Sequence, residues 1–279
     1  MKSLAQHYLK NPGALVGLAI FAVIALVALL ASVLYQQSPW MMVAKPMILP
    51  FTDMAHPMGT DPLGRDVMAG IVHGARVSLL VGFMATFVAL VVGVTVGALA
   101  GYAGGMVDDA LMGITEFFQT VPQLVMAVLV VAILSPTLPS IVGAIALVSW
   151  PPVARLVRGE FLALREREFV QAARVIGQGP LRIIFTQILP NAVSPIIVMG
   201  SFMVATAILT EAALSFLGLG DRNAMSWGFM IGSARSVIRQ SWWLSIAPGV
   251  AIVLTVLAIN LIGEGLNDAL NPQLRKRGE

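Results

Sequence analysis

The stretch GALVGLAIFAVIALVALLASVL, from Gly13 to Leu34, decides the class of this protein, because its 22 residues carry no charge. A helix of that length measures roughly 33 Å at about 1.5 Å per residue, enough to cross the hydrocarbon core of a bilayer. A secretory signal has a shorter apolar region of about 7–15 residues, so we expect a retained first membrane helix. Lys2 and Lys10 precede it and predict a cytoplasmic N-terminus.

The composition favours a membrane protein along the whole chain. Hydrophobic residues make up 58% of it and charged residues only 11%, whereas soluble domains carry about 25% charge. The sequence contains no cysteine, which excludes disulfides and thiolate metal sites, and its three histidines stand far apart. The net charge of +3 comes from basic residues that flank the apolar segments. We therefore expect no metal site and no nucleic-acid partner.

Five further apolar segments predict membrane helices. The long uncharged run from Phe117 to Ala154 is divided at Ser135–Ser140, because Pro136 and Pro139 cannot continue a helix. We expect an all-α integral membrane protein with six transmembrane helices, at 13–34, 76–102, 107–134, 139–160, 191–216 and 243–266. Residues 1–75, with the first helix and a loop, precede a core at 76–279.

Charge orients the six helices. The segments expected on the same side of the membrane as the N-terminus carry eleven lysines and arginines, and those expected on the other side carry six. This asymmetry predicts that both termini and the loop at 161–190 are cytoplasmic, and that 35–75 and 217–242 lie outside.

Gly93, Gly97, Gly101 and Gly105 recur at every fourth position and predict a strip on which another helix can approach closely. One interpretation is ordinary packing within the chain, and the other is a contact that slides during a conformational change.

The cytoplasmic loop contains a short amphipathic helix. Phe169, Ala172, Ala173 and Ile176 share one face, and Arg167, Gln171, Arg174 and Gln178 lie largely on the other. Gly177 suits the left-handed residue that ends a helix, and Pro180 suits the start of the next. By physical chemistry alone, this helix either lies on the lipid surface or docks a soluble partner.

Ionisable residues inside predicted membrane helices are functional candidates. Glu116 and Glu211 qualify, with Asn260 as a polar neighbour, and the three are candidates for a translocation path. The alternative for Glu211 is snorkelling from the outer end of its helix. The sequence has no Gly-Lys pair of the kind that a phosphate-binding loop requires, and no catalytic triad, so we expect no catalysis by this chain.

Several motifs resemble those of ABC importer permeases. Gln171-Ala172-Ala173, Gly177 and Leu189-Pro190 stand at the spacing of the signature loop of that family, although Gln171 replaces its glutamate and Gln187 its isoleucine. The segments 56–66, 165–170, 215–220 and 226–228 are similar to the dipeptide/oligopeptide/nickel group of these permeases. The order of one helix, a long loop and five helices resembles the second, C-type permease of such systems.

The resemblance implies a non-catalytic subunit of the inner (cytoplasmic) membrane that forms half of a path for di- or oligopeptides. It implies a second homologous permease chain as heterodimer partner, a soluble substrate-binding protein, and two ABC ATPase subunits that bind ATP and magnesium, with no cofactor in this chain. The residues that it implies for ATPase coupling are Phe169, Gln171, Ala172, Ala173, Arg174, Ile176, Gly177, Gly179 and Leu181. Those for contact with the binding protein are Gly59, Thr60, Asp61, Gly64, Arg65 and Asp66.

The same residues fit other roles and functions. The outside motif equally fits a turn-rich cap held by Asp–Arg contacts. A nickel or metal-chelate importer of the same family, a passive channel and an intramembrane enzyme are the rival functions, although the last would need paired catalytic groups that the sequence does not show.

Overall fold

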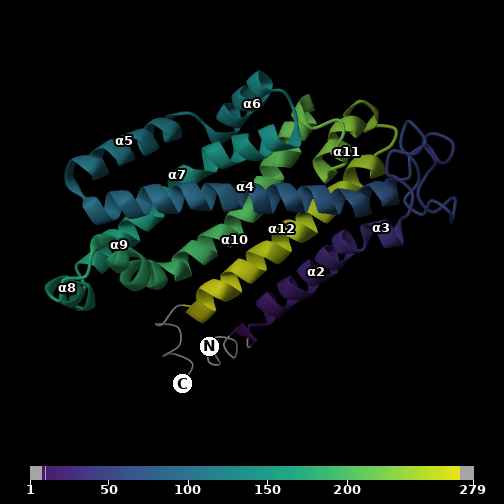
Figure 1. The fold of residues 1–279 in the computed structure, drawn as a ribbon. Helices are drawn as coiled ribbons and strands as arrows, with labels where there is room; N and C mark the ends of the chain where they lie inside the picture. Colours follow the sequence, from purple (N-terminus) through teal and green to yellow (C-terminus); the bar gives the residue numbers. More distant parts are fainter. Residues whose placement is uncertain (1–7, 10, 271–279) are drawn as a thin grey trace.

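The computed structural model describes residues 8–9 and 11–270, and its regular structure there is helical (Figure 1). The long helices are α2 (Pro12–Leu29), α4 (Val67–Ala103), α5 (Gly105–Thr120), α6 (Gln123–Leu134), α7 (Leu138–Arg165), α10 (Leu189–Leu214) and α12 (Trp243–Leu270). The short ones are α3 (Ala31–Leu34), α8 (Glu168–Val175), α9 (Pro180–Ile183) and α11 (Trp227–Ala234). Single wide π turns flank α10 at Ile184–Ile188 and Ser215–Leu219.

The described residues contain five helical segments long and apolar enough to cross a membrane: Pro12–Leu29, Val67–Ala103, Leu138–Arg165, Pro180–Leu219 and Trp243–Leu270. Helices α5 and α6 form a sixth span if the bent pair is counted as one. Figure 1 shows the chain entering α5 at the end of the bundle that carries α8 and leaving α6 toward the opposite end, on the side of α11. The pair therefore carries the chain across the bundle, as a sixth span requires.

The prediction of one unbroken third helix at 107–134 is wrong. The chain bends by 86° between α5 and α6. Val121 is extended (φ −97°, ψ 133°) because the ring of Pro122 disfavours a helical residue before it. Proline also lacks the N–H that would continue the helix.

Helix α4 and the fifth span extend furthest beyond their predicted bounds. Helix α4 begins at Val67 rather than near residue 76, because Asp66 caps it by accepting a hydrogen bond from the Met68 N–H at 2.8 Å. The fifth span runs from Pro180 to Leu219 instead of 191–216, since the π turns continue it at both ends.

The glycine strip of α4 packs against α7. A Cβ placed at Gly93, Gly97 or Gly101 would lie 2.5–2.8 Å from the side chain of Val153, Val157 or Phe161, respectively. Only glycine allows the two helices to approach so closely. A Cβ placed at Gly105 would have no described atom within 4 Å, so the strip ends at Gly101. The interpretation as packing within the chain is confirmed for these three glycines.

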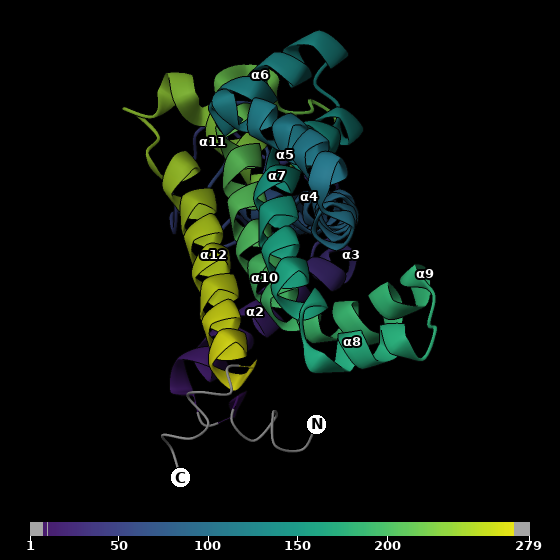
Figure 2. The ribbon, with the colours of Figure 1, turned by 90° about the vertical axis from the view of Figure 1, so that its left-hand side faces the viewer.

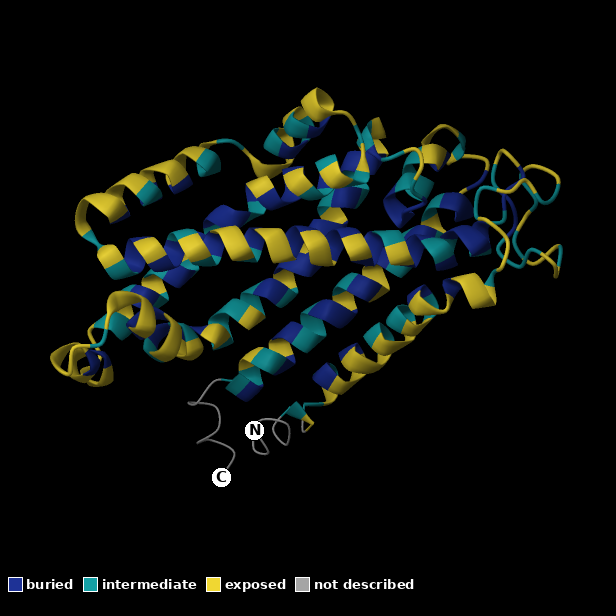
Figure 3. Ribbon diagram, viewed as in Figure 1, coloured by how far each residue is buried: buried dark blue, intermediate teal, exposed yellow. Residues whose placement is uncertain are grey.

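The bundle buries small and apolar residues on its inner faces and leaves large apolar side chains outside. Figure 3 shows this division along α2 and α4, and the exposed residues include Val23, Leu26 and Phe87 at 62%, 58% and 63%. In a bilayer, lipid covers such a surface, so the pattern is typical of a membrane-embedded protein. Figure 2 shows α7, α10 and α12 side by side, with α8 and α9 projecting beyond them.

Candidate functional site

Helix α8 is attached to the bundle by its buried side. Val170 is fully buried and Ala173 is only 4% exposed, within the cluster that also holds Phe161 of α7 and Ile183 of α9. Two further contacts hold α8 in place. The Gln171 side chain donates a hydrogen bond to the Arg165 carbonyl at 3.3 Å, and the Arg174 guanidinium lies 5.8 Å from the centre of the Tyr102 ring.

A Schellman motif ends α8. Gly177 adopts a left-handed conformation with φ +79°. Its N–H donates to the Arg174 carbonyl at 3.0 Å, and the Gln178 N–H donates to the Ala173 carbonyl at 3.1 Å. The prediction that Gly177 terminates the helix is confirmed.

The remainder of α8 and the start of α9 present apolar side chains to the surroundings. We define the α8–α9 surface as Phe169, Val175, Ile176 and Leu181, which are 41%, 87%, 73% and 70% exposed. The sequence placed Ala173 on the same face as Phe169, Ala172 and Ile176. The structure separates them: Ala173 packs inward beside Val170, and the other three are exposed. The α8–α9 surface is therefore open to a partner.

The motif residues of the 35–66 loop form an internal framework. Thr60 is fully buried, donates to the Lys45 carbonyl at 2.6 Å and accepts from the Ile48 N–H at 3.0 Å. The Asp61 carboxylate accepts from the Arg65 side chain and backbone at 2.5 and 2.9 Å. The Arg65 guanidinium also lies 5.4 Å from the Trp40 ring.

Positive φ angles at Gly59 and Gly64, +72° and +76°, allow tight turns against neighbouring carbonyls. Asp66 caps α4 and lies 3.4 Å from His56. The buried state of Gly59, Thr60, Gly64 and Arg65 fits the interpretation as a cap held by Asp–Arg contacts.

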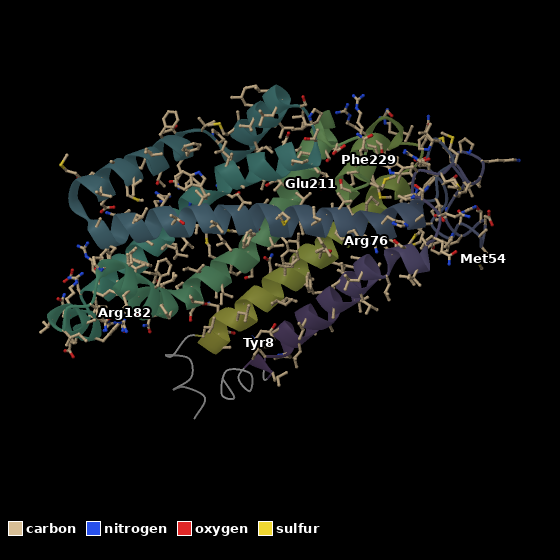
Figure 4. The ribbon with its side chains drawn as sticks, viewed as in Figure 1. Tyr8, Met54, Arg76, Arg182, Glu211 and Phe229 are labelled. Atoms are coloured by element: carbon tan, nitrogen blue, oxygen red, sulfur yellow. The ribbon has the colours of Figure 1, made fainter. Side chains whose placement is uncertain are left out.

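Glu211 lies in a cluster of polar side chains where α10, α11 and α4 meet. Figure 4 labels it in the interior of the bundle. The side chain is 2% exposed, and its Oε1 accepts from Ser215 and Ser226 at 2.8 and 2.7 Å. Ser226 also caps α11 by accepting from the Phe229 N–H at 2.9 Å. Glu211 is thus held by donors inside the protein, and snorkelling to the interface is not what the structure shows.

The Ser226-Trp227-Gly228 motif belongs to the same polar cluster. The Trp227 N–H donates to Ser78 of α4 at 3.1 Å, and its indole N–H donates to the Ile71 carbonyl at 2.9 Å. A Cβ at Gly228 would lie 2.6 Å from the Ala212 Cα and 2.9 Å from the Glu211 carboxylate. The motif therefore fixes α11 between two spanning helices.

The three candidate path residues are not brought together. Glu116 is exposed on α5, Glu211 is buried in α10, and Asn260 is partly exposed on α12. No hydrogen bond between described residues joins any two of them. Within residues 8–9 and 11–270, no group of three or more His, Cys, Asp or Glu side chains could hold a metal ion.

Sequence reasoning missed an ion pair between α5 and α7. The Arg158 guanidinium donates to both carboxylate oxygens of Asp108, at 2.5 and 2.6 Å. Arg165, further along α7, donates to the Gly101 carbonyl at 3.0 Å. Opposite charges at the adjoining ends of two predicted helices were the available signal, but only the folded chain shows which of them meet.

Comparison with known proteins finds two matching family models. The model described as binding-protein-dependent transport system inner membrane component matches residues 93–276. The model described as the N-terminal TM domain of oligopeptide transport permease C matches residues 2–56.

Curated relatives match along almost the whole chain. The di/tripeptide transport system permease protein DppC of Pseudomonas aeruginosa is 39% identical, covering 99% of this chain and 93% of its own. The dipeptide transport system permease protein DppC of Alkalihalophilus pseudofirmus is 42% identical over 95% of this chain and 88% of its own. The DppC of Escherichia coli K12 is 39% identical over 97% and 92%.

Solved structures share the fold. The inward-facing MetNI methionine ABC transporter matches with a TM-score of 0.60 and 21% identity, covering 74% of this chain and 98% of the solved one. An amino acid ABC transporter with histidines matches at 0.57 and 16%, covering 73% and 95%. Family models and relatives agree with the helical bundle and its motifs, and this chain belongs to the binding-protein-dependent permeases, the multi-pass inner-membrane subunits of ABC importers.

Proposed function

We propose that this chain forms half of the path by which di- or oligopeptides, delivered by a soluble binding protein, enter the cell. The peptide class follows from the names of the relatives, which are dipeptide or di/tripeptide permeases. Both termini are cytoplasmic in this proposal, which agrees with the excess of basic residues on that side. A second, homologous permease chain supplies the other half.

The α8–α9 surface is the single observation that carries the coupling role. An apolar face of this kind at the water-exposed end of a membrane bundle is unfavourable unless a partner covers it. We assign that partner as an ABC ATPase subunit, one of two in the complex, which bind ATP and magnesium. Phe169, Gln171, Ala172, Arg174, Ile176 and Leu181 touch the ATPase, whereas Ala173 and Gly177 shape the helix and its turn and Gly179 lies just before α9.

Coupling follows from how α8 is attached. Val170 and Ala173 insert into the cluster that holds Phe161 of α7 and Ile188 just before α10. A displacement of α8 on ATP binding is therefore passed to both spanning helices, since packed interiors move as rigid units. These helices tilt, and access to the path alternates from outside to inside.

The 35–66 loop faces the binding protein in this proposal, but through different residues from those of the motif. Leu49, Phe51 and Met54 are 53%, 76% and 88% exposed, whereas Thr60 and Arg65 are buried in the loop framework. The motif residues hold the shape of the loop, and its exposed apolar side chains make the contact.

Uptake of labelled dipeptide and labelled nickel, side by side, tests the cargo. The strains are one deleted for this chain, one with it restored, and one restored with Ala173→Arg. We expect dipeptide uptake to be lost on deletion, to return with the wild-type chain and to stay lost with the variant. Loss of nickel uptake alone would assign the chain to metal import. Uptake that is unchanged when the cells are depleted of ATP would indicate a passive channel.

A further inference from the structure

Arg76 is a charged residue within a spanning helix that the transport cycle above does not use. It lies in α4, and Figure 4 shows it between α4 and the loop-side end of α2. Its Nε and Nη2 donate to the Ala28 and Leu29 carbonyls at 2.5 and 2.8 Å, and its Nη1 donates to the Ser32 hydroxyl at 2.7 Å. These bonds fix the guanidinium where α2 ends.

The charge of Arg76 has no counter-ion in the described part of the chain. None of the carboxylates of residues 8–9 and 11–270 lies within 4.0 Å of its guanidinium. A guanidinium has five N–H donors, and the hydrogen bonds to Ala28, Leu29 and Ser32 leave two of them without an acceptor among the described residues. An uncompensated charge at the edge of a bilayer is costly, and a phosphate group matches a guanidinium in charge and geometry.

An apolar groove of about 540 Å³ begins at this guanidinium. Phe21, Ala25, Ala28 and Leu29 of α2 line one wall, and Leu79, Leu80 and Phe83 of α4 line the other. From Arg76 to Phe83 the groove extends roughly 10 Å along α4 at about 1.5 Å per residue. Phe21 and Phe83 meet edge to face, with ring centres 6.1 Å apart, and close its far end.

We propose that this groove binds one anionic phospholipid from the leaflet on the loop side of the membrane. Its phosphate contacts the two remaining donors of Arg76, and one acyl chain lies between α2 and α4. A guanidinium at one end of an apolar groove favours a lipid, because the phosphate and the acyl chain match these two parts of the site. The bound lipid ties α2 to α4, whichever cargo the importer carries.

Native mass spectrometry of the purified importer complex tests this inference, with phosphatidylglycerol and phosphatidylcholine of identical acyl chains as probes. We expect the wild-type complex to retain phosphatidylglycerol at about tenfold lower concentration than phosphatidylcholine. Leu80→Trp fills the groove without touching the Arg76 hydrogen bonds, and should weaken retention of phosphatidylglycerol about tenfold. The matched control is Leu99→Trp, because Leu99 is 50% exposed on the same helix outside the groove; it should retain the lipid.

Arg76→Gln removes the charge but keeps an amide donor, and should abolish the preference for phosphatidylglycerol. If that variant fails to assemble, Leu80→Trp still decides the matter. Equal retention of the two lipids by the wild type, or equal retention of phosphatidylglycerol by Leu80→Trp and Leu99→Trp, would overturn the proposal. So would loss of the second permease chain from Leu80→Trp, which would assign the groove to that chain.

Discussion

The turn that ends α8 offers a sharp test of the coupling role, because two glycines in it differ in conformation. Gly177 has φ +79° and Gly179 has φ −69°, and no atom of the described residues lies within 4 Å of a Cβ placed at either position. Any effect of Gly177→Ala is therefore conformational rather than steric. A left-handed residue with a Cβ costs about 1–2 kcal/mol, which is roughly a factor of 5 to 30 in the population of the native turn.

Gly177→Pro is the stronger change. Proline holds φ near −65° and has no N–H, whereas the native turn uses the Gly177 N–H to bond the Arg174 carbonyl at 3.0 Å. We expect a cost of about 3 kcal/mol or more, comparable to proline in a helix interior. The α8–α9 surface would then lose its fixed position relative to Val170 and Ala173, although the spanning helices remain inserted.

The assay is the number of dipeptides imported per ATP hydrolysed by the complex in proteoliposomes that contain the binding protein. We expect Gly177→Pro to lose most of this coupling and Gly177→Ala to reduce it several-fold. Gly179→Ala is the matched control and should equal the wild type. A wild-type ratio in Gly177→Pro would refute the lever role of α8, and an equal loss in Gly179→Ala would show that the conformation of Gly177 is not the cause.

Three further predictions concern the contacts between spanning helices, each measured as thermal unfolding of the purified complex. Gly97→Leu should lower the free energy of unfolding by about 1–3 kcal/mol or more by overpacking against α7. Gly113→Leu should change it little, because a Cβ there has no described atom within 4 Å. Equal losses in the two variants would refute the close approach of α4 and α7. Ser226→Ala should cost about 1–3 kcal/mol, since it removes a cap and leaves a buried carboxylate oxygen with one donor fewer, whereas the exposed Ser233 should tolerate alanine. Asp108→Asn should lower the free energy of unfolding by only roughly 1 kcal/mol, because the Arg158 side chain is 36% exposed and solvent screens the ion pair. A double-mutant cycle that shows no coupling between Asp108 and Arg158 would contradict the ion pair.

The features that sequence predicts well are those encoded within a few residues. The uncharged run from Gly13 gives a membrane helix because length and polarity suffice to place it. Gly177 gives a helix end because a left-handed residue strongly favours glycine. Pro122 carried a signal of the same local kind, since it lies inside an uncharged run and disfavours helix at Val121. The size of the bend that follows, 86°, depends on how α6 packs on α7 and is not local.

The candidate sites depend on contacts between distant residues, which a single sequence does not specify. Glu211 was recognisable as an ionisable residue in an apolar helix, but its donor Ser226 lies beyond a turn on another helix. The Asp108–Arg158 pair joins two helices that are separated by a third. Residue type therefore identified charged groups that need partners, and only the arrangement of the helices shows which partners they have.

The outside loop shows that a motif can identify a family through the residues that build a loop. Glycines with positive φ, a buried threonine and an aspartate that accepts both backbone and guanidinium donors are the residues that a tight loop needs. The glycines and the threonine are buried and Asp61 is partly buried, because these residues make the loop. The exposed Phe51 and Met54 sit on that framework. In our proposal these side chains contact the binding protein, and because any exposed apolar side chain could do so, they form no motif. The distinction predicts that Thr60→Val disturbs folding of the loop, whereas Met54→Asp leaves the fold intact and weakens delivery of cargo by the binding protein.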